Sequence, residues 1–342
     1  MEKQAHIYIY TPPWADWSAG IRVLHYLCDD LNNMGYFAFL AIHGPKTKFD
    51  VNKNLNTPVL TRKLLKSHFD SNNRILVIYP EGIAGNPLKA KFVARWVLNF
   101  PSLLAGPKSF GDEVVFAYSN LLSRSLGKIN PCPIMFVPAV RAIDMEQYGS
   151  RMNIPQKVEG NSYELIYAQK FRALGGRLPK LEHNQMEITR FGRNAPTREE
   201  TLQLIAGAKL IHVYENTTVI TEALILGVPV LCHANEFFEE LIANKELDMK
   251  GVSWDENHLE TPDSEYNLNV LKEAELQSKK QLKQIFMTLD LGKNPYNLDQ
   301  RIQFPRRGII TKHSLSRAKS VLIQKGPMAL SRFFLNYVFR RQ

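Results

Sequence analysis

The chain alternates between short apolar runs and longer segments in which apolar residues recur every three or four positions. Short runs of this kind are typical of buried strands, and the longer spacing is typical of helices that bury one side. The order strand, helix, strand begins near the N-terminus and predicts a parallel α/β sheet with right-handed crossovers. The predicted strands are residues 6–10, 37–42, 74–79, 114–118, 134–137, 163–168, 185–191, 210–214 and 228–231. The predicted helices are residues 21–33, 60–69, 86–100, 197–206, 218–226, 236–244 and 267–289.

A change of composition divides the chain. Residues 139–161 are polar and contain Gly149, Pro155 and Gly160, which favours a connection between domains. A chain of 342 residues is long enough for two domains of ordinary size. We therefore predict domains at residues 1–150 and 151–290, followed by a crossover and basic tail over residues 291–342.

The net charge of +10 is concentrated at the C-terminus. Residues 301–342 contain ten Lys or Arg and no Asp or Glu, whereas the other 300 residues carry 33 of each sign. Within residues 314–341, aromatic side chains cluster beside aliphatic ones and are not interleaved with the basic residues. This pattern favours an anionic membrane surface over nucleic acid as the partner. The alternative is that these apolar side chains pack on the body of the protein.

Several classes of protein are excluded by what the sequence lacks. No apolar run reaches the roughly 18–20 residues of a transmembrane helix, and the N-terminus has no signal-peptide core. The three cysteines lie far apart, which predicts reduced, buried thiols in a cytoplasmic protein. There is no P-loop, H-E-x-x-H, G-x-S-x-G or histidine pair with metal-ligand spacing. We expect neither a cofactor nor a metal.

Residues 208–232, AKLIHVYENTTVITEALILGVPVLC, predict a strand, a loop, a short helix, a turn and another strand. The unpaired N–H groups at a helix start can bind a phosphate, and Asn216, Thr217 and Thr218 are small polar residues suited to that place. Glu215 precedes the helix and Glu222 lies within it. These carboxylates could bind sugar hydroxyls, or they could simply complement the helix dipole.

The segment YENTTVITEALILGVPV resembles the C-terminal-domain signature of GT-B glycosyltransferases, of the family 4-like type. Many retaining members have two glutamates separated by seven residues, whereas six residues separate Glu215 and Glu222. The resemblance implies an α/β protein with two Rossmann-like domains facing a cleft, in which the second domain binds a nucleotide sugar. The sequence contains no D-x-D motif, which fits a metal-independent GT-B enzyme.

The resemblance also assigns residues to the donor. In GT-B enzymes the first strand of the second domain commonly delivers a basic residue to the donor diphosphate, and Lys170 and Arg172 match that position. A cation there would stabilise the charge that develops on the leaving diphosphate. Residues 216–218 and Glu222 would complete the donor site, and Glu215 is a catalytic candidate.

The first domain is expected to bind the acceptor. SAGIRVLHYLCDDLNNMGY resembles the first loop and helix of GT-B enzymes, and YPEGIAGNPL looks like another loop of their N-terminal domain. Ser18, Gly20 and Glu81 would line the acceptor side, and His43 could reach it. Asp16 is the candidate general base if the enzyme inverts, and it would only orient the acceptor if the enzyme retains.

The function implied by the resemblance is transfer of a sugar from a nucleotide-sugar donor to a glycan or lipid-linked acceptor. Bacterial surface-polysaccharide synthesis, such as that of capsule or lipopolysaccharide, fits this reaction. With the basic tail, we expect a cytoplasmic protein held peripherally at the inner face of a membrane. One alternative is a nucleotide-sugar epimerase on the same fold, which would release free product. The other is a non-catalytic binding protein that uses the tail. Donor base and sugar, acceptor, stereochemistry and oligomeric state are left open.

Overall fold

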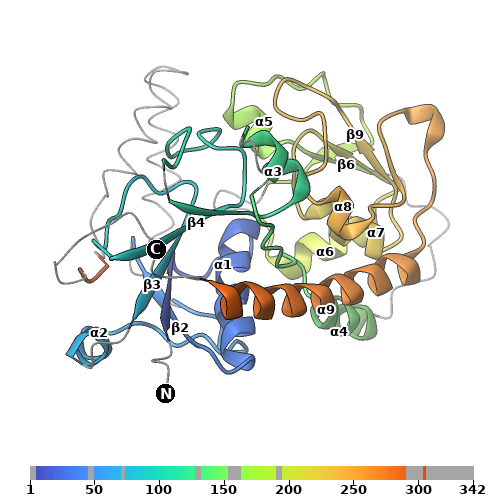
Figure 1. The fold of residues 1–342 in the computed structure, drawn as a ribbon. Helices are drawn as coiled ribbons and strands as arrows, with labels where there is room; N and C mark the ends of the chain where they lie inside the picture. The colour runs from blue at the N-terminus through green and yellow to red at the C-terminus, as the bar shows by residue number, and fades with distance from the viewer. Residues whose placement is uncertain are drawn as a thin grey trace. The chain divides into compact units, whose positions relative to one another are not determined.

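The computed structural model describes residues 5–44, 50–70, 74–111, 113–127, 132–152, 163–189, 195–289 and 303–305. The chain divides into two compact units, and each unit holds one parallel sheet (Figure 1). Unit 1 comprises the described residues up to Val137 and those from Gln277 onward. Unit 2 comprises Pro138–Leu276. The expected α/β class with two Rossmann-like sheets is confirmed.

The sheet of unit 1 has the strand order β2-β1-β3-β4-β5. β1 pairs with β2 from His6↔Phe37 to Thr11↔Ile42, and β3 pairs with β1 on its other side. The strands are almost continuously apolar because a parallel sheet is covered on both faces. Its strands are β1 (His6–Thr11), β2 (Phe37–Ile42), β3 (Ile75–Pro80), β4 (Phe92–Val97) and β5 (Val114–Ala117), and its helices include α1 (Ala19–Asn33), α2 (Arg62–Asp70) and α3 (Asn120–Ser125).

Unit 2 repeats the same topology. Its order is β10-β9-β8-β6-β7, so in each unit the first strand lies between the second and the third. β6 pairs with β8 from Glu164↔Leu210 to Tyr167↔Val213. The strands of unit 2 are β6 (Glu164–Tyr167), β7 (Gln185–Glu187), β8 (Leu210–Val213), β9 (Val230–Cys232) and β10 (Val252–Ser253), and its helices include α4 (Ala142–Met152), α5 (Gln169–Ala173), α6 (Arg198–Ala206), α7 (Val219–Ile225), α8 (Asn244–Leu247) and the 3-10 helix Glu256–His258.

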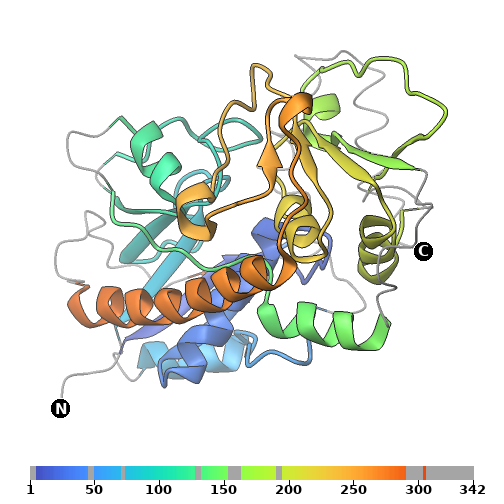
Figure 2. The same ribbon diagram turned by 90° about the vertical axis from the view of Figure 1, so that its right-hand side faces the viewer.

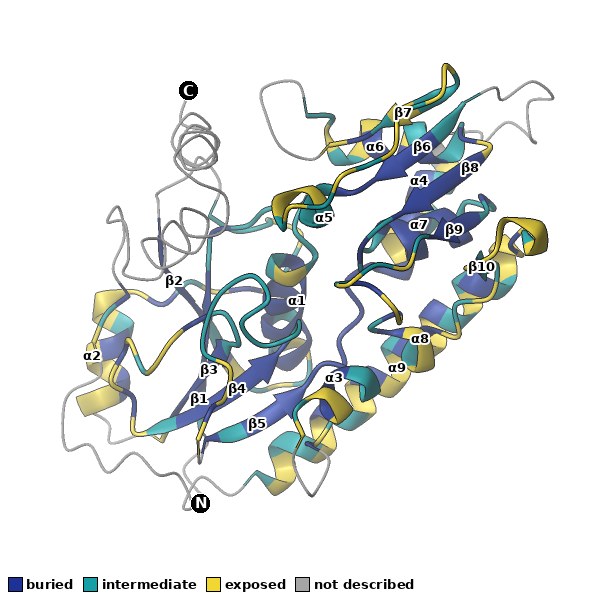
Figure 3. Cartoon of the chain, turned by 90° about the horizontal axis from the view of Figure 1, so that it is seen from above, coloured by how far each residue is buried: buried dark blue, intermediate teal, exposed yellow. Residues whose placement is uncertain are grey.

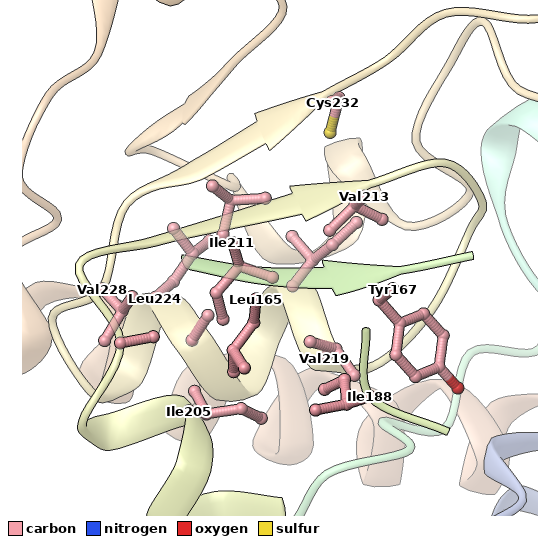
Figure 4. Close-up of a cluster of buried hydrophobic side chains, with 14 of the residues drawn as sticks. Leu165, Tyr167, Ile188, Ile205, Ile211, Val213, Val219, Leu224, Val228 and Cys232 are labelled. Carbon is pink, nitrogen blue, oxygen red and sulfur yellow. The ribbon is translucent and has the colours of Figure 1, made fainter. Parts of the chain in front are cut away.

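The core of unit 2 forms where α7 packs against the sheet (Figure 4). Leu165, Ile211, Val213 and Val219 all have 0% exposure. Most strand residues are dark blue in Figure 3, with β7 as an exception, and the exposed residues lie mainly on the outer sides of helices and on loops. Burial of this apolar surface supplies the main stabilisation of the unit.

Most of the predicted helices are confirmed. α6 begins with a capping box, in which the Thr197 hydroxyl accepts the N–H of Glu200 and the Glu200 carboxylate accepts the N–H of Thr197. α9 (Ser264–Thr288) matches the predicted long helix and runs without a break in Figure 2. Within unit 1, its Ser278 hydroxyl donates to the Phe136 carbonyl at 2.6 Å.

The predicted helix over residues 86–100 is wrong, because residues 92–97 form β4, which lies between β3 and β5 in the sheet. The Asn86 side chain closes a turn instead of starting a helix, since its amide donates to the Ala90 carbonyl and its oxygen accepts the Ala90 N–H. Trp96, with 0% exposure, donates its indole N–H to the Met135 carbonyl at 2.9 Å. Tertiary pairing therefore overrides the local pattern.

The predicted helix over residues 236–244 is also wrong. Asn235 and Phe238 exchange two backbone hydrogen bonds as an isolated antiparallel bridge, and α8 begins only at Asn244. The Asn216 side chain holds this segment, because its amide donates to the Glu240 carbonyl and its oxygen accepts the Ile242 N–H. The predicted strand at residues 134–137 is reduced to a single bridge between Ala117 and Ile134.

Two further predictions remain predictions. The domain bounds at residues 150 and 290 are not decided by the division into units. The tail at residues 314–341, with its expected membrane contact, lies outside the described residues.

Candidate functional site

The order of the strands identifies the position on each sheet where a ligand is expected to bind. Where neighbouring strands lead off in opposite directions, the connections leave a crevice outside their carboxyl ends, and ligands of open α/β sheets bind there. In unit 2 this switch point lies between β6 and β8. α5 follows β6, and the loop of residues 214–218 follows β8. The predicted donor residues Lys170 and Glu215 come from these two connections.

Glu215 anchors the start of α5. Its side chain is buried, and its Oε2 accepts the backbone N–H groups of Lys170 and of Phe171, the latter at 3.0 Å. Ala168, the residue before the helix, has no side chain that could supply this cap. Glu215 therefore satisfies N–H groups that would otherwise lack a partner at the helix start.

Lys170 brings a positive charge to the same place. Its Nζ donates to the Asn216 carbonyl and lies 3.8 Å from Oε1 of Glu215. The side chain is 32% exposed, so it is only partly covered by the protein. The structure therefore brings together three predicted residues, Lys170, Glu215 and Asn216, around one cation at the switch point.

The other loop residues have structural contacts. The Asn216 side chain bonds to the backbone at residues 240 and 242. Thr217 accepts the N–H of Val219 at 3.3 Å, whereas Thr218, at the predicted cap position, makes no side-chain cap bond. The loop is thus held in shape largely by its own side chains.

Two predicted donor residues are engaged elsewhere. Glu222 has 0% exposure and pairs with Arg198 of α6 at 2.6 Å. Arg172 donates two hydrogen bonds of 2.7 Å to Glu187 of β7. Burial and pairing of Glu222 indicate a structural contribution, which the sequence could not reveal because its partner lies 24 residues away.

A row of half-buried rings at the same edge was missed by sequence reasoning. Phe171, Tyr214 and His233 follow β6, β8 and β9 respectively. The rings of Tyr214 and His233 are stacked at 4.3 Å, and Phe171 lies 5.3 Å from Tyr214. Only the sheet brings these residues together, and the sequence offers no local signal for the row.

Unit 1 places Glu81 at its own switch point, directly after β3 and beside the end of β1. Its Oε2 accepts the Leu98 N–H at 3.0 Å. Burial raises the pKa of Glu81 to about 7, against the opposing effects of backbone hydrogen bonds and of Arg95. A half-buried carboxyl that titrates near neutral pH is a candidate for proton exchange.

Arg95 holds the backbone of the loop that contains Glu81. It is 1% exposed, pairs with Glu113 through bonds of 2.7 and 2.9 Å, and donates to the carbonyls of Ile83 and Gly85. Its guanidinium is therefore engaged mainly with Glu113 and the loop backbone. Because Arg95 is engaged in this way, burial is the dominant influence on the pKa of Glu81.

The remaining predicted residues of unit 1 lie near the start of α1, apart from His43, which follows β2. Asp16 lies in the turn before it, Ser18 is its N-cap without a side-chain hydrogen bond, and Gly20 is its second residue. His43 follows β2 and stacks on Tyr10 at 4.2 Å. Their predicted roles toward an acceptor remain predictions.

Within the described residues, no group of three or more His, Cys, Asp or Glu side chains is arranged to hold a metal ion. No helix in that part of the chain has the length and apolar character needed to cross a membrane.

Comparisons with known proteins find structural likeness only. No protein-family model and no curated protein matches this chain. The structure is similar to the glycosyltransferase SnogD from Streptomyces nogalater, with 13% identity, a TM-score of 0.35, and coverage of 94% of this chain and 100% of that chain. It is also similar to UDP-GlcNAc 2-epimerase from Neisseria meningitidis bound to UDP-GlcNAc, with 12% identity, a TM-score of 0.38, and coverage of 86% and 96%. A third similar structure is Phytolacca americana UGT2, with 10% identity, a TM-score of 0.35, and coverage of 84% and 95%.

Proposed function

We propose that this protein is a GT-B-type glycosyltransferase that binds a nucleotide sugar in unit 2. The observation that carries the proposal is the position of the Lys170 ammonium, at the carboxyl ends of β6 and β8 where ligands of such sheets bind. An ammonium has three N–H donors and serves well as a phosphate ligand. Loss of a sugar leaves negative charge on the diphosphate, and a cation held in place stabilises that charge.

A thermal-shift panel of UDP, GDP, CMP, dTDP and their common sugars tests the proposal. A ligand that binds the native state raises the melting temperature by linkage. We expect one nucleotide to do so, and we expect Lys170→Met to weaken the effect. Arg172→Met is the matched control on the same helix, because Arg172 is engaged with Glu187 and should leave the shift unchanged. A panel in which no nucleotide shifts the wild type contradicts the proposal.

Transfer must then be separated from epimerisation. Incubating the bound nucleotide sugar without an acceptor and following its sugar by NMR distinguishes the two reactions. A transferase leaves the configuration at C2 of the sugar unchanged and consumes the donor only when an acceptor is added. Formation of an epimer in the absence of acceptor would replace the proposed reaction with the alternative one.

We further propose that the acceptor is a glycan or a lipid-linked glycan of a bacterial surface polysaccharide, and that the basic tail binds the inner face of the membrane. The support is the ten basic residues within residues 301–342 and the clustered aromatic and aliphatic residues within residues 314–341. Co-sedimentation with vesicles rich in anionic lipid, compared with neutral vesicles and an oligonucleotide at the same salt concentration, tests the tail. Binding to neither vesicle type rejects membrane contact.

A further inference from the structure

Three titratable side chains form a hydrogen-bonded chain that connects neighbouring strands of the sheet of unit 2. Oε2 of Glu164, at the start of β6, lies 3.0 Å from Nε2 of His212 on β8. Nδ1 of His212 lies 2.9 Å from Nε2 of His233, which follows β9. The amide of Gln185 also donates to Oε2 of Glu164, at 3.2 Å. The chain leads from the first residue of β6 to the carboxyl edge where Tyr214 and Lys170 lie.

The protons in this chain can be assigned from chemistry. Burial raises the pKa of Glu164, but the hydrogen bonds from His212 and Gln185, together with the electrostatic effects of His212 and Lys209, outweigh burial. The pKa of Glu164 therefore lies below its ordinary value, and the group is ionised at neutral pH. A carboxylate only accepts, so Nε2 of His212 carries the proton between them. If the His212 ring is neutral, its Nδ1 is then an acceptor and Nε2 of His233 is the donor.

This assignment leaves Nδ1 of His233 as a lone-pair acceptor. Burial and the neighbouring His212 lower the pKa of His233 to about 4, so the ring stays neutral at pH 7. Within the described part of the chain, no protein group donates a hydrogen bond to this nitrogen. The ring is half-buried and stacked on Tyr214. The Asn235 amide fixes the backbone on both sides of this stack, because it donates at 3.0 Å to the main-chain carbonyls of Tyr214 and His233.

We propose that His212 is the neutral Nε2–H tautomer and that Nδ1 of His233 accepts a hydrogen bond from an N–H or O–H group of the bound nucleotide sugar. Glu164 and His212 are then positioning residues that hold the required tautomer of His233. This inference rests on the proposed function. It assigns His233 to ligand selection, because an acceptor fixed in this way favours ligands that present a donor and disfavours those that present a lone pair.

The tautomers can be observed without any ligand. A ¹⁵N-histidine long-range correlation spectrum of the full chain at pH 7 distinguishes Nδ1–H from Nε2–H rings. We expect both His212 and His233 to be neutral Nε2–H tautomers. Glu164→Leu removes the acceptor and should give mixed tautomers at His233, whereas Lys250→Met, at an exposed side chain of the same unit, should not. An Nδ1–H tautomer at His233, or an imidazolium at His212, overturns the assignment.

Binding tests the contact itself. His233→Gln keeps an N–H donor near His212, so the fold should persist. The variant has no counterpart of Nδ1, so it should lose the contact with the ligand. We expect affinity for the nucleoside diphosphate selected by the panel to fall about 5- to 10-fold, as for one lost hydrogen bond, and affinity for pyrophosphate to stay unchanged. An N-methylated base and a 2′-deoxyribose analogue then identify the donor, since the relevant analogue loses affinity for the wild type but not for His233→Gln.

Equal affinity of wild type and His233→Gln for every nucleotide overturns the proposal. Failure of the proposed function looks different, because no nucleotide would then bind the wild type at all. The tautomer spectrum would remain readable in that case and would still report whether Glu164 and His212 set the state of His233.

Discussion

Glu81 and Glu215 occupy equivalent places in two sheets of the same topology. Each follows the third strand of its unit, beside the first strand. Glu81 accepts one N–H from Leu98, and burial raises its pKa to about 7. Glu215 accepts two N–H groups at the start of α5 and lies 3.8 Å from the Lys170 ammonium. Similar backbone positions therefore carry carboxyl groups in different electrostatic surroundings.

The two glutamates differ in what their neighbouring basic side chain contacts. Arg95 is buried beneath the Glu81 loop and is paired with Glu113, so it organises the backbone more than it stabilises the charge of Glu81. Lys170 belongs to α5, and its ammonium lies 3.8 Å from the Glu215 carboxylate. Topology thus places a carboxyl at each switch point, while side-chain pairing decides whether that edge suits proton exchange or anion binding.

The largest effects should come from the buried ion pair in each unit. Arg95→Met removes the partner of Glu113, and Arg198→Met removes that of Glu222, which has 0% exposure. Breaking a buried pair from one side costs about 3–5 kcal/mol because a charge is left buried. Urea denaturation should show this loss of unfolding free energy for both variants. Arg172→Met, at an exposed pair, should cost no more than about 1 kcal/mol, and equal effects at all three positions would refute the distinction.

A smaller loss is expected where Gly106 packs on the Glu81 loop. A Cβ at Gly106 would lie 2.2 Å from the carbonyl oxygen of Glu81, and Gly106 has φ of +90°. Gly106→Ala should therefore destabilise unit 1 by roughly 2–3 kcal/mol through backbone strain and a forced shift. Gly111→Ala is the matched control, since its φ is +56° with open space at the Cβ position. If Gly111→Ala loses as much stability as Gly106→Ala, backbone strain alone accounts for the loss, and the close contact with the Glu81 carbonyl contributes nothing.

The corresponding test in unit 2 removes the cap of α5. Glu215→Ala leaves the N–H groups of Lys170 and Phe171 without their acceptor and should cost about 1–3 kcal/mol. Glu215→Gln keeps an oxygen acceptor and should lose less. Urea denaturation measures both variants, and a Glu215→Ala protein as stable as wild type would show that the cap contributes nothing.

The sequence predicted the order of elements well because apolar spacing and caps act locally, as at Thr197 and Glu200. It failed at β4, where the pairing of residues 92–97 with distant strands overrides a helix-like pattern. The proximity of Lys170 and Glu215 was predictable, because the GT-B resemblance assigned both residues to one site and each follows the end of a predicted strand. The pairing of Arg198 with Glu222, and the contact of His212 with His233, depend on register between elements that no local pattern encodes.

The smallest effect concerns Glu81 and separates the two glutamates by pH. The pKa of Glu81 rises from 4.5 to about 7 on folding, so between these values the folded state binds more protons than the unfolded state. Stability contributed by the neutral carboxyl is therefore lost as pH rises through this window. Glu81→Gln stays neutral, and it should match wild type at pH 5 and melt roughly 1–3 °C higher at pH 8. Glu239→Gln, at an exposed side chain, should show no such dependence. A melting difference for Glu81→Gln that is the same at both pH values would mean that Glu81 ionises as an ordinary surface carboxyl, and the contrast with Glu215 would then rest on hydrogen bonding alone.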